Sequence, residues 1–337
     1  MGGTGERIGI KEVAAAAGVS ITTVSHALNG KGRLPEETRE RVRDVAEALG
    51  YVPSATARSL ARGRTGILAL TVARVEAMPF SLADFDYFSQ LMNGASTAAL
   101  ERGYALVLAP SAAGTDLLDS VPLDGAIVVD PVRGDRTLAH LRRRGVPVVT
   151  TGREPDGVDD APWIDNDHIA GTMSILDHLA AAGARRVALI TTPPVHSYTI
   201  DSQAAYRDWC AGHGSDPEIA IVTGTLTEGE GYSAALELLD RDDPPDGIYA
   251  TLDRLALGVL LAAHARGVNV PGELLVAGCT DSHASQGAAL TALSLDPERI
   301  GVEAVESLIA VTESRADPPA HRYVPTTVIP RASTKGG

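Results

Sequence analysis

Beyond Gly66, short uninterrupted apolar segments alternate with stretches of helical character, and this alternation limits the fold more than any other feature of the chain. Strands that are apolar along their whole length are typical of parallel sheets covered on both faces by helices. Seven such segments suit two doubly wound lobes better than one, and ligands of such sheets bind beyond the carboxyl ends of the strands. The predicted strands are 67–72, 105–108, 125–129, 146–150, 186–190, 247–250 and 274–278.

Residues 1–65 follow a different pattern. Residues 10–49 are Ala-rich with a helical period and are interrupted at 18–20 and at 29–32, which predicts three short helices. Pro53 ends the third helix and can begin a further helical segment at 54–61. We therefore predict a multidomain chain: an all-α domain at 1–52, a short helix and linker at 53–65, and an α/β domain of two lobes with doubly wound, parallel sheets at 66–337.

The charge of the chain is unevenly distributed. The net charge is −14, yet residues 1–64 hold ten Lys and Arg against seven Asp and Glu, whereas the remainder holds nineteen against thirty-six. Because attraction to phosphate supplies most sequence-independent affinity for nucleic acid, DNA contact would be confined to the N-terminal domain.

Several function classes are disfavoured by what the sequence lacks. No signal peptide and no apolar run of membrane-spanning length is present, so we expect a cytoplasmic protein without a membrane partner. Cys210 and Cys279 stand alone in apolar stretches, which predicts buried thiols and neither a disulfide nor a metal site. No phosphate loop, nucleophile elbow or dinucleotide fingerprint follows a strand, so we predict no catalytic residue and no cofactor. The alternative functions are those of a solute-binding protein and, less favoured, of an enzyme on the same fold.

The second predicted helix has the features of a base-reading helix. Ser20 followed by Thr23 forms an N-cap, so the helix should begin at Ile21 and end near residue 28. Thr22 and His26 lie four residues apart on its polar face. Taken alone, this face fits either base contacts in the major groove or simple solvation.

The surrounding sequence resolves that choice through a resemblance. Ile10 to Gly30, IKEVAAAAGVSITTVSHALNG, closely resembles the helix-turn-helix of the lactose repressor (LacI/GalR) family, and the match continues through 35–42 and 49–60. The resemblance implies base contacts from Ile21, Thr22 and His26, with Ser20 at the cap of the same helix. It also implies a hinge helix at 54–61 that inserts Leu60 into the minor groove, where an apolar wedge bends DNA. Arg58 would contact phosphate or keep the linker soluble.

The resemblance extends more loosely to the C-terminus, through 165–167, 253–258, 278–281, 299–305 and 329–334. It implies a periplasmic-binding-protein-like effector domain whose chain crosses three times between lobes, with lobe 1 at about 66–165 and 295–325 and lobe 2 at about 166–293 and 327–337. The implied function is that of a ligand-responsive, sequence-specific transcriptional regulator, most simply a repressor that binds a palindromic double-stranded DNA operator as a homodimer. We expect helix 297–314 to supply dimer contacts through Ile300, Val302, Val305, Leu308 and Ile309.

Three positions in the implied effector cleft depart from the family pattern. Ser202 replaces a common arginine, Leu252 an asparagine, and Thr280 an aspartate, and these family side chains ordinarily clasp sugar hydroxyls. A site without them has little reason to select a free hexose, so we expect a small-molecule effector that is a modified or larger saccharide or a related, less hydroxylated metabolite. His196 or His283 could supply compensating hydrogen bonds.

Acidic and aromatic residues complete the set of candidate ligand contacts. Asp130, Asp167, Asp253 and Asp281 follow or end predicted strands, where carboxylates either bind a ligand or cap helices. The segment 78–88 holds four aromatic residues, Tyr87 and Phe88 among them, in a chain that is only 4% aromatic. Together with Tyr198 they would form a stacking wall of the cleft or pack in the core.

Overall fold

The computed structural model describes residues 8–28, 32–51, 64–72, 86–110, 116–155, 157, 161–313 and 321–335. The chain divides into two compact units, 1–66 and 67–337. We refer to them as the head and the body.

The head is a bundle of three helices, as the sequence predicts. They are α1 (Ile10–Ala17), α2 (Ile21–Leu28) and α3 (Glu36–Ala48). Val13, Val24 and Val42, one from each helix, are fully buried and form the centre of a small core. Gly18 ends α1 with φ +67°, a left-handed conformation that glycine adopts without strain and that allows the sharp turn into α2.

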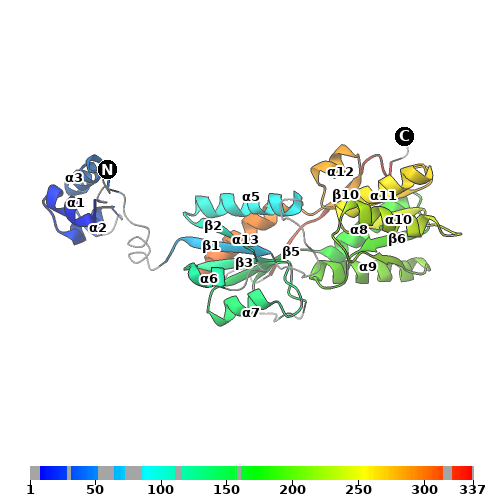
Figure 1. Ribbon diagram of the computed structural model, residues 1–337, viewed down its shortest axis with the longest axis horizontal. Helices are drawn as coiled ribbons and strands as arrows, with labels where there is room; N and C mark the ends of the chain where they lie inside the picture. The colour runs from blue at the N-terminus through cyan, green and yellow to red at the C-terminus, as the bar shows by residue number, and fades with distance from the viewer. Residues whose placement is uncertain are drawn as a thin grey trace, which may run out of the picture. The chain divides into compact units, whose positions relative to one another are not determined.

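The body contains two six-stranded sheets (Figure 1). The first has the order β11-β5-β4-β3-β1-β2 and is parallel; the second has the order β12-β10-β9-β8-β6-β7 and is parallel except for β12. The strands of the first sheet are β1 (Ile67–Val72), β2 (Ala105–Pro110), β3 (Gly125–Val129), β4 (Val148–Thr151), β5 (Trp163–Asn166) and β11 (His321–Val324). Those of the second are β6 (Val187–Thr191), β7 (Glu218–Ile221), β8 (Gly247–Ala250), β9 (Leu275–Cys279), β10 (Thr291–Ser294) and β12 (Thr327–Ile329).

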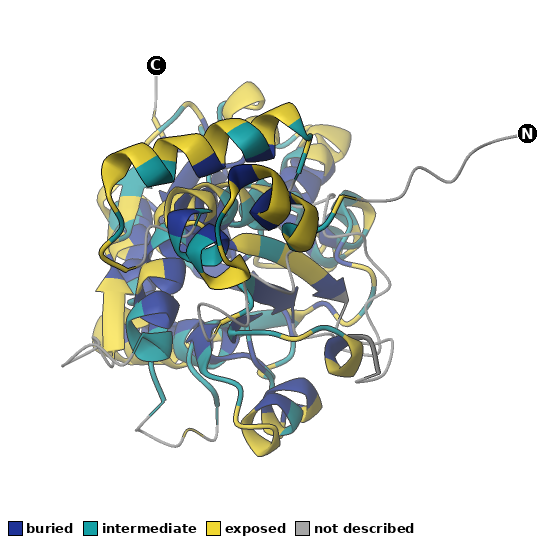
Figure 2. Ribbon diagram, turned by 90° about the vertical axis from the view of Figure 1, so that its left-hand side faces the viewer, coloured by how far each residue is buried: buried dark blue, intermediate teal, exposed yellow. Residues whose placement is uncertain are grey.

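Helices cover both faces of each sheet. In the first lobe, α5 (Asp86–Glu101) and α13 (Pro297–Thr312) cover one face, and α6 (Asp116–Ser120) and α7 (Arg136–Arg143) cover the other. In the second lobe, α10 (Glu228–Leu239) and α11 (Asp253–Arg266) lie opposite α8 (His168–Ala181) and α9 (Ser197–His213), and the short α12 (His283–Gly287) follows β9. Single helices carry a buried side and an exposed side (Figure 2), as expected for amphipathic helices packed on a sheet.

The chain passes between the lobes three times: after β5, after β10 and after β11. One side chain ties these passages together. The amide Nδ2 of Asn166 donates to the carbonyl oxygens of Leu295, at 3.0 Å, and of Val324, at 2.8 Å. Asn166 is 1% exposed, so the contact is sheltered from water and fixes the crossing segments relative to one another.

One expectation about the body is wrong. Ile300, Val305, Leu308 and Ile309 of α13 are at most 1% exposed and belong to the core of the first lobe, so they cannot serve as a dimer surface. The reason is that α13 packs against both α5 and the sheet, and two neighbours require a wider apolar face than one. Beyond the predicted strands, the structure adds β5, β7, β10, β11 and β12, which are only three or four residues long.

In each lobe, two helices approach so closely that only glycine fits between them. A Cβ on Gly301 of α13 would lie 2.1 Å from the carbonyl oxygen of Leu91 in α5. In the second lobe, a Cβ on Gly258 of α11 would lie 2.2 Å from the carbonyl oxygen of Glu228 in α10. The backbones of the paired helices are therefore in direct contact.

We expect Gly301→Ala to destabilise the body by about 1 to 3 kcal/mol, because the added methyl group forces α5 and α13 apart. The matched control is Gly212→Ala in α9, where no atom lies within 4 Å of the new Cβ. That variant should keep or slightly raise stability, because alanine favours helix over glycine by up to about 1 kcal/mol. Thermal denaturation of the two variants provides the measurement, and equal melting temperatures would contradict the close approach.

Candidate functional site

The main pocket of the body lies where strands of both sheets end. It is partly open to solvent, and its wall is mostly apolar with a few polar groups, as in small-molecule sites. Both lobes contribute to its wall at the carboxyl ends of their strands, where doubly wound sheets bind ligands. The lining consists of Val72, Asp86, Tyr87, Phe88, Asp130, His168, His196, Tyr198, Ser202, Leu226, Tyr249, Thr251, Leu252, Asp253, Cys279, Thr280 and Leu295.

Aromatic rings form much of this wall. The His196 and Tyr198 rings are stacked, with centroids 5.3 Å apart and planes 12° apart, and Tyr87 meets Phe88 edge to face at 5.4 Å. Phe88 packs against core clusters of both lobes, and Tyr87 does the same. These residues therefore fulfil both roles considered from the sequence, because they line the pocket and also join the lobes. Phe80 and Phe85, in 78–88, lie outside the described residues.

Two carboxyl groups of the pocket are held in unfavourable surroundings. Burial, reinforced by the charge of Asp165, raises the pKa of Asp130 to about 7, while His168 opposes the shift. Burial also raises the pKa of Asp253, although hydrogen bonds from Ser282 and from the backbone of Arg254 partly offset it. The charges of His168 near Asp130 and of Arg254 near Asp253 only partly offset burial, which makes both carboxyl groups candidates for contact with a ligand.

Asp86 differs from the other two acids of the pocket. It accepts hydrogen bonds from the backbone N–H of His283, at 2.7 Å, and from its ring Nδ1, at 3.0 Å. These bonds hold the pKa of Asp86 below its usual value. His283 thus binds α12 to the start of α5 and is not part of the pocket lining.

The three positions that depart from the family pattern all lie in the lining. Ser202 projects from α9, and Leu252 and Thr280 follow β8 and β9. Leu252 occupies the N-cap of α11 without a side-chain hydrogen bond to the helix. Thr280 has φ +87°, which is a strained conformation for a β-branched residue, and such strain is concentrated at ligand sites.

Two of the predicted ligand contacts, Asp167 and Asp281, lie outside the pocket lining. Asp167 is the N-cap of α8 and accepts a hydrogen bond from the backbone N–H of Ala170 at 2.9 Å, which is the capping role considered from the sequence. Asp281 forms an ion pair with Arg331 at 2.6 Å and faces a separate polar recess. Because side chains of consecutive residues point in different directions, Thr280 lines the pocket and Asp281 does not.

Several lining residues were missed by the sequence analysis. Thr251 directly follows a predicted strand, so that rule alone would have found it. His168 directly follows Asp167, which was named from the sequence, but the four-residue β5 before them is not among the predicted strands. His196 had been named only as a source of compensating hydrogen bonds. The remaining lining residues that the sequence analysis did not name as ligand contacts are Val72, Asp86, Leu226, Tyr249, Cys279 and Leu295.

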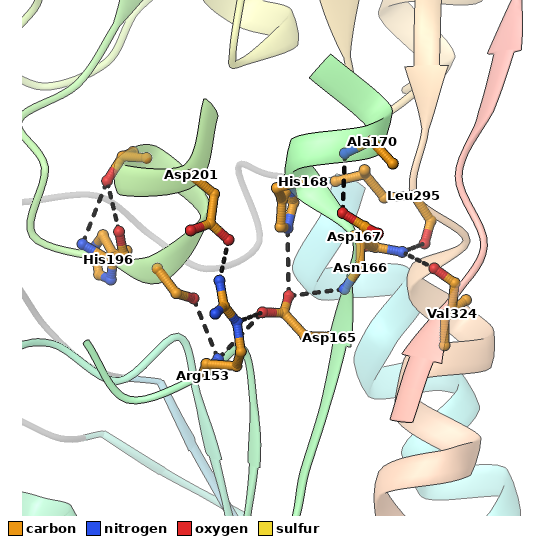
Figure 3. A network of polar contacts seen from close by, with 12 residues as sticks. Arg153, Asp165, Asn166, Asp167, His168, Ala170, His196, Asp201, Leu295 and Val324 are labelled. Carbon is orange, nitrogen blue, oxygen red and sulfur yellow. Dashed lines mark hydrogen bonds and ion pairs between the residues drawn. The ribbon is translucent and has the colours of Figure 1, made fainter. Parts of the chain in front are cut away.

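A polar network joins the two lobes beside the pocket (Figure 3). Arg153, in the first lobe, pairs its guanidinium with Asp201 on α9 of the second lobe and lies 3.5 Å from Asp165. Its backbone N–H donates to Ser197 Oγ at 3.2 Å. Asp201 directly precedes Ser202 of the pocket, so α9 connects this network to the ligand site.

The proposed DNA-reading surface is on the head. Ser20 Oγ accepts a hydrogen bond from the backbone N–H of Thr23 at 3.1 Å, which is the predicted N-cap of α2. Ile21 is 45% exposed, Thr22 is also exposed, and His26 is half-buried. Arg58 and Leu60 lie outside the described residues. No helix in the described part of the chain combines the length and apolarity that a membrane span requires, and no acid, His and Cys cluster there could hold a metal ion.

Comparison with known proteins yields two family matches. Residues 9–54 match the lacI family of bacterial regulatory proteins, and residues 176–334 match a periplasmic binding protein-like domain. The HTH-type transcriptional regulator CelR of Thermobifida fusca is 30% identical over 335 residues, which span 96% of this chain and 97% of that protein.

Two solved structures are similar over nearly the whole chain. A complex of the transcriptional regulator CelR with cellobiose is 27% identical, with a TM-score of 0.72 and coverage of 97% of this chain and 100% of that one. The lac repressor dimer bound to operator and the anti-inducer ONPF is 22% identical, with a TM-score of 0.84 and coverage of 98% and 100%; this second likeness concerns the fold alone.

The raised pKa of Asp130 makes stability depend on pH. Between its ordinary value of 3.8 and about 7, the folded protein binds a proton more tightly than the unfolded chain, so stability falls as the pH rises. We expect Asp130→Asn to be more stable than the parent by about 1 to 4 kcal/mol near pH 8 and nearly equal to it near pH 4. Thermal denaturation of the variant between about pH 4 and about pH 8 is the measurement. The control is Asp208→Asn, which changes an exposed acid of α9 and should leave stability unchanged at every pH. A stability gain of Asp130→Asn that does not vary with pH would refute the raised pKa.

Proposed function

The chain belongs to the lacI family of bacterial regulatory proteins, and from this premise we propose that it is an effector-controlled repressor that binds a palindromic operator as a homodimer. Its relatives are transcriptional regulators rather than enzymes. The observation that carries the proposal is the coexistence, in one chain, of a capped helix with an exposed N-terminal end and a two-lobed body with a pocket at the carboxyl ends of its strands.

The geometry of α2 supports base reading by this helix. Its buried side, Val24 and Ala27, packs in the head core, which leaves Ile21 and Thr22 facing outward at the N-terminal end. Recognition helices present this end to base edges in the major groove. We propose that Ile21, Thr22 and His26 contact bases and that Ser20 fixes the start of the helix.

Exposed apolar residues on the body support a homodimer. Several lie on β2 and β7, each at the edge of its sheet, and on α5 and α11, whereas Ile169 of α8 and Tyr323 of β11 are exposed elsewhere. An edge strand with exposed apolar side chains promotes aggregation unless another chain or element covers it, and a two-fold axis would cover both lobes with the same surfaces of a second copy. The residues of β2, β7, α5 and α11 that we propose for the dimer contact are Leu100, Val107, Leu108, Ile221 and Leu261, which are between 37% and 69% exposed.

We propose that the effector binds in the body pocket and is not a free hexose. Ser202, Leu252 and Thr280 all face the pocket in place of the arginine, asparagine and aspartate expected there. The CelR relative is seen in complex with the disaccharide cellobiose, and a larger or modified saccharide is compatible with a pocket that has a stacking wall.

The test of DNA recognition begins with operators selected from random DNA by the purified full-length protein. We expect a palindromic sequence that binds two chains, as measured by sedimentation of the complex. Leu60→Ala should weaken operator binding by about 1 to 3 kcal/mol, because it removes the minor-groove wedge. His26→Ala should relax the preference at one base pair of each half-site, whereas Arg58→Ala should mainly reduce the salt dependence.

Ser233→Ala, an exposed position of α10, serves as the control and should bind like the parent. Complexes with one chain per operator would disprove the dimer, and unchanged affinity of Leu60→Ala would disprove the hinge role. Selection that enriches no sequence would refute the regulator itself.

For the effector, we expect no micromolar binding of glucose, galactose or ribose in calorimetric titrations. Restoring one group, as in Ser202→Arg, should not create binding, since a buried charge without partners costs more than one hydrogen bond returns. The triple variant with Leu252→Asn and Thr280→Asp should bind hexose measurably. Micromolar hexose binding by the parent protein would exclude this assignment.

A further inference from the structure

Resting on the proposed effector function of the body pocket, we propose that its ligand carries a positively charged amino group, as an amino sugar or another hydroxylated amine does. The proposal concerns the charge of the ligand, which neither the family matches nor the similar structures specify. It follows from the balance of charged groups around the cavity.

Acidic groups outnumber basic ones around the pocket. Among the described lining residues, Asp86, Asp130 and Asp253 carry carboxyl groups and none is Lys or Arg. The segment 73–85, outside the described residues, holds one Arg against one Asp and one Glu, so its sequence adds no net positive charge. Anionic effectors such as phosphates and carboxylates would therefore be repelled.

The guanidinium of the neighbouring polar network is already engaged. Arg153 pairs with Asp201 and lies 3.5 Å from Asp165, and it is not part of the lining. Its two acidic partners would lose their counter-charge if it turned toward the pocket. Arg153 therefore balances the interlobe network and is not a partner of Asp130 or Asp253 in the pocket.

The described groups that face Asp130 are an acid, an imidazole and two phenols. From β5 it is faced by Asp165, from α8 by His168, and from α5 and α9 by Tyr87 and Tyr198. His168 Nε2 lies 3.3 Å from Asp165, so that imidazole is already paired with another acid.

His196, the other imidazole of the pocket lining, does not supply a positive charge to the Asp130 carboxyl group either. The His196 ring Nδ1–H donates to the backbone carbonyl oxygen of Asp130 at 3.0 Å, rather than to its carboxyl group. Burial lowers the pKa of His196, which favours its neutral form. Burial raises the pKa of both Asp130 and Asp253 more than the nearby charges of His168 and Arg254 lower it, so neither carboxylate is fully compensated.

An ammonium group on the ligand would meet both features of the wall. It would form charge-assisted hydrogen bonds with the carboxylates, and the faces of Tyr198 and Tyr87 would attract it through their ring quadrupoles. A neutral polyol would leave the carboxyl groups without a counter-charge and would also lack the arginine and asparagine that clasp hydroxyls, because Ser202 and Leu252 stand in their places.

The experiment titrates the full-length protein with matched ligands by calorimetry. The charged probes are glucosamine and its β-1,4 disaccharide, chitobiose. Their neutral N-acetyl counterparts are N-acetylglucosamine and N,N′-diacetylchitobiose, and their hydroxyl counterparts are glucose and cellobiose. We expect each amine to bind at least about 10-fold more tightly than its neutral counterparts. Amine affinity should also rise between about pH 5 and about pH 6.5, where the amino sugar keeps its proton, because a cation favours ionised Asp130 and its binding releases a proton.

A pair of isosteric variants assigns the effect to the pocket. Asp130→Asn removes the charge with little change in shape and should lower amine affinity about 10-fold and flatten its pH dependence. Asp208→Asn removes one charge from the exposed side of α9, outside the lining, and should bind amines like the parent. Equal losses in both variants would show that only the net charge of the protein matters and would overturn the assignment.

Operator binding by the same preparation separates the two proposals. If the protein binds its operator but binds the neutral sugars as tightly as the amines, or binds none of the amines, the charge inference is overturned and the regulator stands. If no operator is bound at all, the proposed function fails independently of any ligand result.

Discussion

The body depends on one buried amide. Asn166 reaches from the end of β5 to the backbone of the two other passages between the lobes, and its Nδ2 satisfies the carbonyl oxygens of Leu295 and Val324. Without it those buried carbonyls would lack a partner, and an unsatisfied buried acceptor costs about 1 to 3 kcal/mol. Asp165, His168 and the lining residue Leu295 lie on these same segments. The geometry of the pocket therefore depends on the hydrogen bonds that Asn166 makes to the other two passages.

The pocket accepts several unfavourable features that a core would avoid. Asp130 and Thr280 both have positive φ, 47° and 87°, and Asp130 and Asp253 are carboxyl groups removed from water. Proteins tolerate such strain where the surrounding structure determines it and where ligand binding relieves it. The rigid helix pairs α5–α13 and α10–α11, in backbone contact through Gly301 and Gly258, provide that support in each lobe.

Helix α9 connects ligand contact with lobe contact. His196 and Tyr198 near its start and Ser202 one turn later line the pocket, while Asp201 between them pairs with Arg153 of the other lobe. A ligand that shifts α9 therefore changes an interlobe ion pair as well as its own contacts. In a regulator, this is the kind of two-state contact through which a pocket can bias a distant surface.

The sequence by itself determined the three helices of the head, the N-cap of α2 and the two-lobed α/β body, because capping residues, helical period and uninterrupted apolar strands are local signals. It also brought Ser202, Leu252 and Thr280 to one site through the family resemblance. Only the tertiary structure decided that Asp167 caps a helix, that Asp281 pairs with Arg331, and that the apolar face of α13 is internal. The physical reason is that side-chain partners and buried charge depend on neighbours distant in sequence, which no local pattern specifies.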